Sequence, residues 1–300
     1  MFNKEVKSVL DLIQAFPTEQ SCIEHLEKIR WNGNVVSPFD ATSKVYKTKV
    51  GYQCKNTGKN FNVKTNTIFD NTKLPLVKWF LAIWIATSHK KGISSLQLGR
   101  DLDITQKSAW FMLQRIRACF DIDIDTKLDG EVEVDETAIG GLETNKHADK
   151  KSDNPYAGDK ATVMGMVQRE GKVVAMHVAD RKAGSLVPQI IEIVSTTAKL
   201  YTDEWVGYNS LRRVYDHSVV KHNAHQYVNG RVHTNTIEGF WSLLKRGIFG
   251  IYHFTSKKHL QKYVDEFAFR YNSREITSKQ RFDLMLGQME NRLTYKMLIG

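Results

Sequence analysis

The residues best suited to chemistry are three acids that lie far apart along the chain, Asp135, Asp203 and Glu238. The segment EVEVDET alternates like a strand, which places Glu131, Glu133 and Asp135 on one face. Asp203 follows a short apolar run in YTDEW, 68 positions after Asp135, and Glu238 lies 35 positions further on in VHTNTIEGFWSLLKR. Carboxylate oxygens of this kind suit Mg²⁺ or Mn²⁺. A solvated edge strand would explain the first acidic face equally well.

Two such ions, about 3.5–4 Å apart, could hold both the attacking and the leaving oxygen of a phosphodiester. Helical spacing puts Asn235, Glu238 and Lys245 along one face of the third segment. We favour Glu238 as the third metal ligand because a carboxylate binds Mg²⁺ better than a neutral amide does, with Asn235 as a neighbour or a substitute. Lys245 would then contact a phosphate, and Arg246 follows it.

The charge balance favours a polyanionic partner. The chain has 300 residues, 43 Lys and Arg against 33 Asp and Glu, a net charge of +10 and a pI near 9.3. Residues 121–136 reverse this balance with eight acidic residues and one basic residue. The composition of the whole chain is that of a globular protein, and its three cysteines predict a reducing compartment and no disulfide framework. We expect an intracellular protein, because the first residues do not resemble a signal peptide and no apolar stretch is long enough to span a membrane.

The elements expected to position the acids alternate between strands and helices. Strands are expected over 131–137, 161–167, 172–178, 199–203 and 218–221, and helices over 185–197, 236–246 and 256–273. In this order, the strands and helices form a mixed α/β layer that matches the order found in ribonuclease-H-like folds. We therefore expect a catalytic domain over residues 126–275, followed by a C-terminal tail over 276–300.

The N-terminal part predicts smaller units. We expect helices in residues 1–30, a small β unit in 31–70 and a helix over 76–88. Residues 92–119 have the outline of a helix-turn-helix DNA reader within a 71–125 region, with Leu96, Leu98 and Leu102 as apolar positions and Ser94 or Ser95 and Thr105 as caps. Plain helical packing explains the same pattern. If this helix pair binds DNA, we expect Gln106, Lys107, Arg115 and Arg117 to make the contacts.

Together, VEVDETAIGG, YTDEWVGYNSL, HTNTIEGFWSLLKRGIFGIYH and HLQKYVDEFAFRYNSR resemble the DDE-type transposases of the Merlin superfamily and their bacterial insertion-sequence relatives. The resemblance spans nearly the whole chain. It implies a ribonuclease-H-like core, divalent metal, and cut-and-paste movement of double-stranded DNA with terminal inverted repeats. It assigns the first two catalytic acids to Asp135 and Asp203, and the third to Asn235 or Glu238. It further implies a homo-oligomer in the active complex. We expect the protein in the cytoplasm or nucleoid if the host is a bacterium, and in the nucleus if the host is a eukaryote.

One feature departs from the family pattern. Relatives carry a zinc ribbon built from two Cys-x2-Cys pairs, whereas this chain has Ser37 with Asp40 and Cys54 with Thr57. A closed zinc site needs four good ligands, so we expect no zinc there. This raises the alternative function of a decayed or domesticated DNA-binding protein without catalysis, and a structure-selective nuclease is a third possibility.

Other side chains near the third acid have plainer explanations. We expect His222, His225 and His233 to be solvated or bonded to the backbone rather than metal ligands. Trp205 and Trp241 could stack on bases, but buried core positions are the preferred interpretation.

Overall fold

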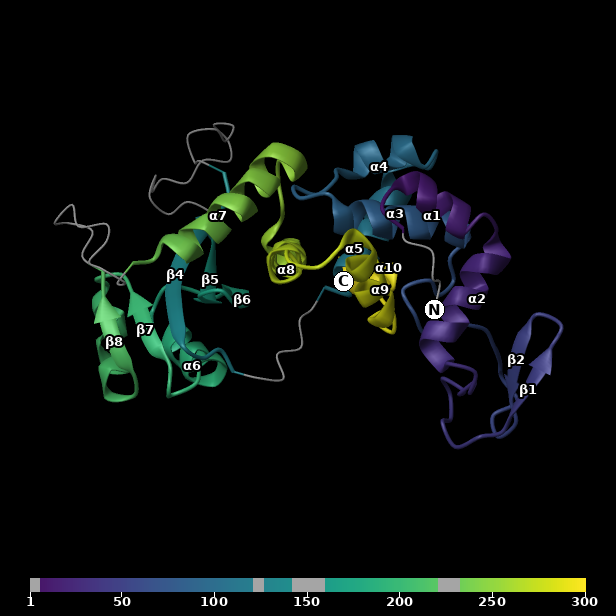
Figure 1. The fold of residues 1–300 in the computed structure, drawn as a ribbon, viewed down its shortest axis with the longest axis horizontal. Coiled ribbons are helices and arrows are strands. Elements are labelled where there is room, and N and C mark those ends of the chain that lie inside the picture. The colour runs from purple at the N-terminus through teal and green to yellow at the C-terminus, as the bar shows by residue number, and fades with distance from the viewer. Residues whose placement is uncertain (1–5, 121–126, 142–159, 221–232) are drawn as a thin grey trace. The chain divides into compact units, whose positions relative to one another are not determined.

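The computed structural model describes residues 6–120, 127–141, 160–220 and 233–300, which form two compact units (Figure 1). Unit 1 contains the N-terminal residues up to Phe120 together with Glu275–Gly300, and unit 2 runs from Asp121 to Arg274. In these ranges no helix is long and apolar enough to cross a membrane.

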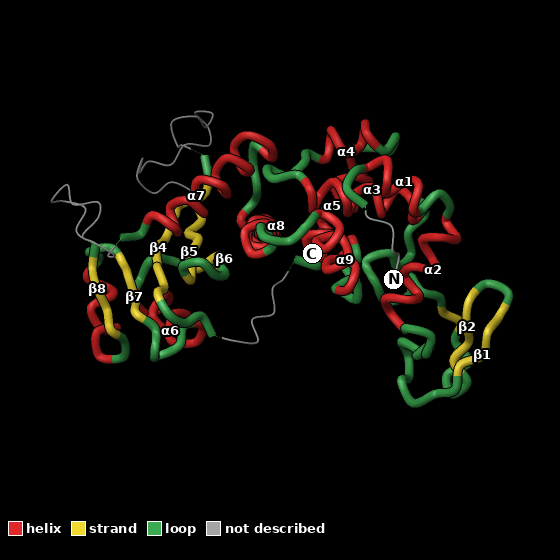
Figure 2. Tube along the Cα trace, in the orientation of Figure 1, coloured by secondary structure: helices red, strands yellow, loops and turns green. Residues whose placement is uncertain are grey.

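Unit 1 is mainly helical and is built around one buried helix (Figure 2). Its elements are α1 (Val9–Ala15), α2 (Glu19–Trp31), β1 (Val45–Thr48), β2 (Gly51–Cys54), β3 (Asn60–Phe61), α3 (Leu76–Ser88), α4 (Ser95–Asp101), α5 (Gln106–Arg117), α9 (Ser278–Gly287) and α10 (Tyr295–Ile299). α3 is apolar along nearly its whole length, and α1, α2, α5 and α9 pack against it. The segment expected to be a C-terminal tail therefore folds as part of this unit.

The helix pair α4 and α5 forms where the sequence indicates it. Ser94 caps α4 by accepting from the Gln97 amide, and Thr105 caps α5 by accepting from the Ser108 amide. Leu98 and Leu102 are buried, but Leu96 is 53% exposed. Of the three apolar positions expected on this helix, Leu98 and Leu102 therefore face the core and Leu96 does not.

Unit 2 is a mixed α/β unit around a sheet of five described strands. Its elements are β4 (Glu131–Ile139), β5 (Ala161–Gln168), β6 (Val173–Val178), α6 (Ala183–Ile193), β7 (Lys199–Thr202), the 3₁₀ helix η3 (Val206–Arg213), β8 (Asp216–Val219), α7 (Asn235–Gly247), the π-helical turn η5 (Ile248–Tyr252) and α8 (Lys257–Asn272). β4, α7 and α8 begin and end within two residues of the expected bounds.

The strand order is β6-β5-β4-β7-β8. β4, β5 and β6 pair antiparallel, whereas β7 pairs parallel with β4 on one side and with β8 on the other. β4 is therefore an interior strand, and the alternative of a solvated edge strand is wrong. β5 is apolar on both faces and β4 has buried Val132 and Val134 on one face, which suits both strands to interior positions of the sheet.

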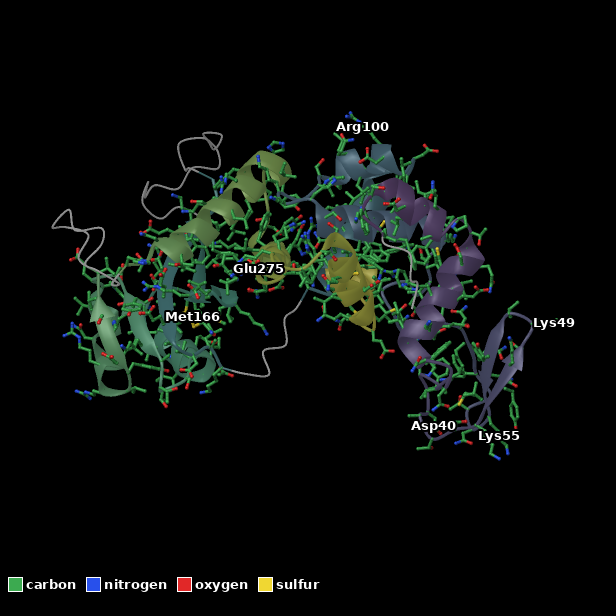
Figure 3. All side chains as sticks on the ribbon, viewed as in Figure 1. Asp40, Lys49, Lys55, Arg100, Met166 and Glu275 are labelled. Carbon is green, nitrogen blue, oxygen red and sulfur yellow. The ribbon has the colours of Figure 1, made fainter. Side chains whose placement is uncertain are left out.

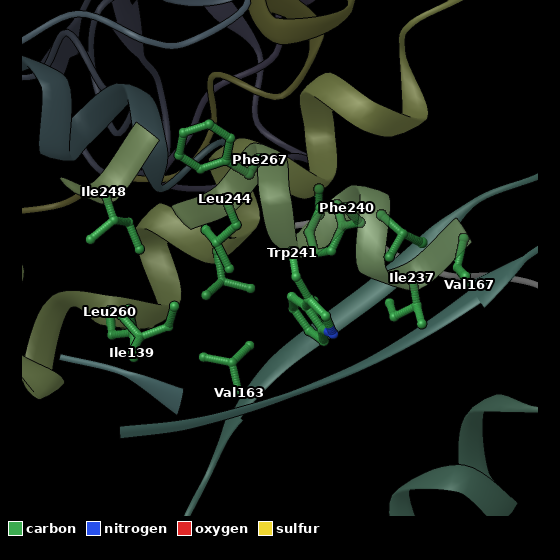
Figure 4. Close-up of a cluster of buried hydrophobic side chains, with 14 of the residues drawn as sticks. Ile139, Val163, Val167, Ile237, Phe240, Trp241, Leu244, Ile248, Leu260 and Phe267 are labelled. Carbon is green, nitrogen blue, oxygen red and sulfur yellow. The ribbon is translucent and has the colours of Figure 1, made fainter. Parts of the chain in front are cut away.

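Each face of the sheet has its own apolar cluster. α7 and α8 cover one face through residues such as Phe240, Trp241 and Phe267 (Figure 4). α6 and η3 cover the other face, where Val132, Val134 and Met166 are buried; Met166 is labelled on β5 in Figure 3. The two clusters fix the sheet between its helices and so hold α7 across β4 and β5.

Candidate active site

The strand β4 presents the predicted acidic face towards α7. Val132 and Val134 are fully buried in the α6 cluster, so the alternate residues Glu131, Glu133 and Asp135 lie on the opposite face. Exposure differs along this face, because Glu133 is completely buried while Glu131 and Asp135 are partly buried. The three acids therefore occupy three different environments.

Asp135 is held by a tryptophan of α7. The indole Nε1–H of Trp241 donates to Oδ2 of Asp135 at 2.9 Å. Gly165 pairs with Asp135 on β5, and a Cβ there would lie 2.5 Å from the Trp241 ring. Burial raises the pKa of Asp135 above its ordinary value, and the charges of Asp203 and Glu238 raise it further, while the Trp241 hydrogen bond opposes both.

Asp203 lies at the carboxyl end of β7, beside β4. The parallel register pairs Glu133 with Tyr201, and two residues further along the two strands stand Asp135 and Asp203. Asp203 is partly buried, and its Oδ1 accepts from the Trp205 amide at 3.1 Å. The register thus brings together two acids that are 68 positions apart in the sequence.

The first turn of α7 supplies the third acid. Glu238 is exposed, and the Thr234 hydroxyl donates to its Oε1 at 3.2 Å. Its charge acts on Asp135, as does that of Asp203, so the three predicted acids share one electrostatic environment. Asn235 is exposed at the first position of α7. Further along the helix Lys245 is partly buried and Arg246 is exposed.

The donor chemistry of these acids suits a divalent cation. Asp135, Asp203 and Glu238 offer hard carboxylate oxygens, and each already uses one oxygen in the protein hydrogen bonds given above. Within the described ranges, no three or more His, Cys, Asp or Glu side chains are arranged as a group that could hold a metal ion.

Comparison with known proteins decides the family. Residues 127–272, which carry all three acids, match the ISXO2-like transposase domain. This part of the chain belongs to the DDE-type insertion-sequence transposases. The predicted resemblance is confirmed, and the mixed sheet of unit 2 is compatible with the ribonuclease-H-like domain of such transposases.

Two relatives extend the match. The chain is 28% identical over 286 residues to an uncharacterized protein in transposable element ISH50 of Halobacterium salinarum, covering 89% of this chain and 94% of the relative. It is also 28% identical over 109 residues to an uncharacterized transposase-like protein of Haemophilus influenzae, covering 36% of this chain and 87% of the relative. No solved structure matches the chain.

Glu133 of the transposase domain has a role that sequence reasoning missed. The guanidinium of Arg169, directly after β5, donates from Nε to Oε1 of Glu133 at 2.7 Å. The Nδ1 atom of His233 lies 3.2 Å from the same oxygen, so this ring faces a carboxylate, contrary to the expectation that it is solvated or backbone-bonded. His222 and His225 lie outside the described residues. The strand pattern could not reveal Arg169 as a partner.

Glu136, next to Asp135, points to the other face of β4. It accepts a short hydrogen bond from the hydroxyl of Tyr208 on η3. Burial raises the pKa of Glu136 to about 7, and the charges of Asp135 and Asp203 contribute, while the bond from Tyr208 and the charge of Arg181 oppose the rise. Burial also raises the pKa of Tyr208. An acid whose pKa is raised to about 7 thus adjoins the candidate site.

Two of the predicted DNA-contact residues on α5, Arg115 and Arg117, are buried, so the prediction is wrong for both. Arg115 is 7% exposed and donates to the carbonyl oxygens of Leu293, Ile68 and Asp70, each at 2.9 Å. Arg117 is 2% exposed. A guanidinium enclosed in this way cannot reach a phosphate, so these residues stabilise unit 1.

The other predicted α5 residues lie at the surface. Gln106 and Lys107 are exposed at the start of the helix, and Gln106 donates from Nε2 to the Ser95 hydroxyl of α4 at 2.9 Å. These two residues remain the candidates for DNA contact from α5.

At the positions where the resemblance leads us to expect a degenerate zinc ribbon, hydroxyl groups surround the thiol of Cys54. Ser37 is 3% exposed, and its Oγ accepts from the amides of Phe39 and Asp40. Burial alone would raise the pKa of Cys54, but hydrogen bonds with Ser37, Ser43 and Thr57 lower it to about 6. Cys22, Cys54 and Cys119 are all free thiols.

Of the two tryptophans expected in the core, Trp241 is buried and Trp205 is only partly buried. Trp241 is 4% exposed and points from α7 into the cluster above β5 (Figure 4), as expected for a core residue. Trp205 is partly buried and packs edge-on against Tyr208 at a centroid distance of 5.0 Å. The hydrogen bond from Trp241 to Asp135 had no signal in the sequence, because it depends on where α7 crosses β4.

Proposed function

We propose that this chain is a DNA transposase that cuts phosphodiester bonds at the ends of a mobile element and joins the freed 3′-hydroxyl to target DNA. The observation that carries the proposal is the parallel register of β4 and β7, which sets Asp135, in the middle of β4, beside Asp203 at the carboxyl end of β7. Glu238 acts electrostatically on the same carboxyl group. We take unit 2 as a ribonuclease-H-like catalytic domain over residues 126–275.

Asp135, Asp203 and Glu238 would hold one or two Mg²⁺ or Mn²⁺ ions, with Asn235 as the substitute for Glu238. A bound ion supplies the positive charge that activates the attacking hydroxyl group and stabilises the departing oxygen. The indole of Trp241 fixes the orientation of Asp135 through its hydrogen bond and excludes water from one side of that carboxylate. Partial burial of Asp135 strengthens its interaction with any cation, because the local dielectric constant is low.

Basic and polar side chains outside the acids would bind DNA. Lys245 lies two helical turns after Glu238 on α7, where it would contact the phosphate being cut, and Arg246 extends the same end of the helix. Gln106 and Lys107 would contact double-stranded DNA from the helix pair α4 and α5 within residues 71–125. A homo-oligomer would hold both element ends and the target during strand transfer.

The test is strand cleavage on duplex DNA that carries the repeats flanking the gene, with Mg²⁺ or Mn²⁺. Cleavage by the wild type should fall at least a thousandfold in Asp135→Asn and Asp203→Asn, because each removes a charged ligand. Asp216→Asn is the matched control, since Asp216 is exposed at the start of β8, at the opposite end of the parallel strands. It should cut like the wild type.

The other outcomes separate the competing functions. Sequence-selective binding without metal-dependent cutting would contradict the proposal and support a decayed DNA-binding protein. Cutting at DNA junctions regardless of the repeats would instead support a structure-selective nuclease.

A further inference from the structure

The N-terminus of α7 is capped from another element. Its N-cap residue, Thr234, makes no side-chain capping bond. Instead, the amides of Thr236 and Ile237 donate to Oε2 of Glu133 at 2.8 and 3.0 Å, and the Thr236 hydroxyl donates to Oε1 at 2.9 Å. A carboxylate from β4 thus satisfies the free N–H groups of the helix that carries Glu238, and its charge is favourable at this end of the helix dipole.

Buried counter-charges hold this cap in one orientation. Glu133 is 0% exposed, so its charge requires partners. Arg169 donates to it from Nε and also donates from its terminal nitrogen to the His233 carbonyl at 2.9 Å, just before α7. The guanidinium also lies over the Tyr201 ring of β7, 4.4 Å from its centroid. Arg169 therefore ties together β4, β7 and the residue leading into α7.

The position of the cap relates it to the candidate acids. Glu133 precedes Asp135 by two residues on the same face of β4, and Glu238 directly follows Ile237 on α7. Any displacement of the α7 N-terminus from Glu133 would therefore move Glu238 relative to Asp135. We propose that Glu133 is a positioning residue, which, locked by Arg169, sets the spacing between the acid of β4 and the acid of α7. This inference rests on the proposed function of the site.

The first measurement needs no activity. In Glu133→Ala, hydrogen exchange at the amides of Thr236 and Ile237 should accelerate about five- to thirtyfold, the factor that corresponds to losing a helix cap. Glu131→Gln is the matched control, because Glu131 lies on the same face and bonds to Arg169 and Tyr201. It should leave exchange at the two α7 amides unchanged.

The second measurement is the Mg²⁺ dependence of strand cleavage. Glu133→Gln keeps the side-chain volume and one acceptor oxygen but loses the charge that pairs with Arg169. It should raise the Mg²⁺ concentration for half-maximal cleavage at least fivefold while DNA affinity stays within twofold of the wild type. A cap that only stabilises the fold would lower the melting temperature without changing the metal requirement.

Two results would overturn the inference. One is unchanged exchange at Thr236 and Ile237 in Glu133→Ala, or in Glu133→Gln if the alanine variant does not fold. The other is an unchanged metal requirement in Glu133→Gln, or one raised equally by Glu131→Gln. If the wild type cuts no DNA, the proposed function fails, while the exchange measurement still decides whether Glu133 caps α7.

Discussion

Glu136 should make the stability of the protein depend on pH near neutrality. Its pKa is raised from an ordinary value of 4.5 to about 7, first by burial on the η3 side of β4. An acid whose pKa is raised by folding binds its proton more tightly in the folded state. Its contribution to stability is therefore fully present below pH 4.5 and is lost as the pH rises through 7.

The size of this effect follows from the shift. Each pKa unit corresponds to about 1.4 kcal/mol, so ionisation of Glu136 should cost the folded state about 3–3.5 kcal/mol above pH 8. Glu136→Gln removes the ionisation but keeps an oxygen that accepts from the Tyr208 hydroxyl. The variant should gain about 3 kcal/mol relative to the wild type between pH 4.5 and pH 8.5.

Urea unfolding followed by tryptophan fluorescence at four pH values measures this difference. Glu192→Gln, which removes an exposed carboxylate of α6, controls for the loss of one surface charge. A stability difference between Glu136→Gln and the wild type that stays constant from pH 4.5 to 8.5 would refute the reasoning.

Three further substitutions probe the packing around the candidate site and unit 1. Gly165→Ala should destabilise the protein by about 1–3 kcal/mol in thermal melts, because the new Cβ would lie 2.5 Å from the Trp241 ring and 2.8 Å from Ile237; an unchanged melting temperature would contradict this. Trp241→Phe removes the donor to Asp135, so the pKa of Asp135 should rise further and the acidic limb of the cleavage-rate profile should move to higher pH; a shift to lower pH would contradict it. Arg115→Met should cost about 3 kcal/mol in urea unfolding because buried carbonyls lose their donor, and DNA affinity of the folded variant should be unchanged; weakened DNA binding without loss of stability would reverse that interpretation.

Local chemistry made much of the fold predictable. The alternation of β4, the apolar helix α3 and the caps Ser94 and Thr105 all depend on residues within a few positions of one another. Strand alternation, a strand end and helix spacing pointed in the same way to Asp135, Asp203 and Glu238, and the family resemblance gave them their catalytic roles. Their shared environment depends on the parallel register of β4 and β7, which follows from the element order.

What the sequence could not reveal depends on pairs that only the fold brings together. Glu133 looked like one of three equivalent acids, because Arg169 and the α7 amides lie 36 and 103–104 positions away. Arg115 looked like a DNA contact because its helix is basic, yet the Leu293 carbonyl that binds it is 178 positions away. Helical periodicity shows which residues share a face but not which face the C-terminal helices will cover.

The proposed function depends most directly on where divalent ions bind. The decisive measurement is anomalous diffraction from crystals of the protein with element-end DNA and Mn²⁺. It should show manganese between the carboxylates of Asp135 and Asp203, with Glu238 or Asn235 as a third protein ligand. Manganese bound elsewhere, with Asp135 and Asp203 bonded only to protein groups, would contradict the central claim.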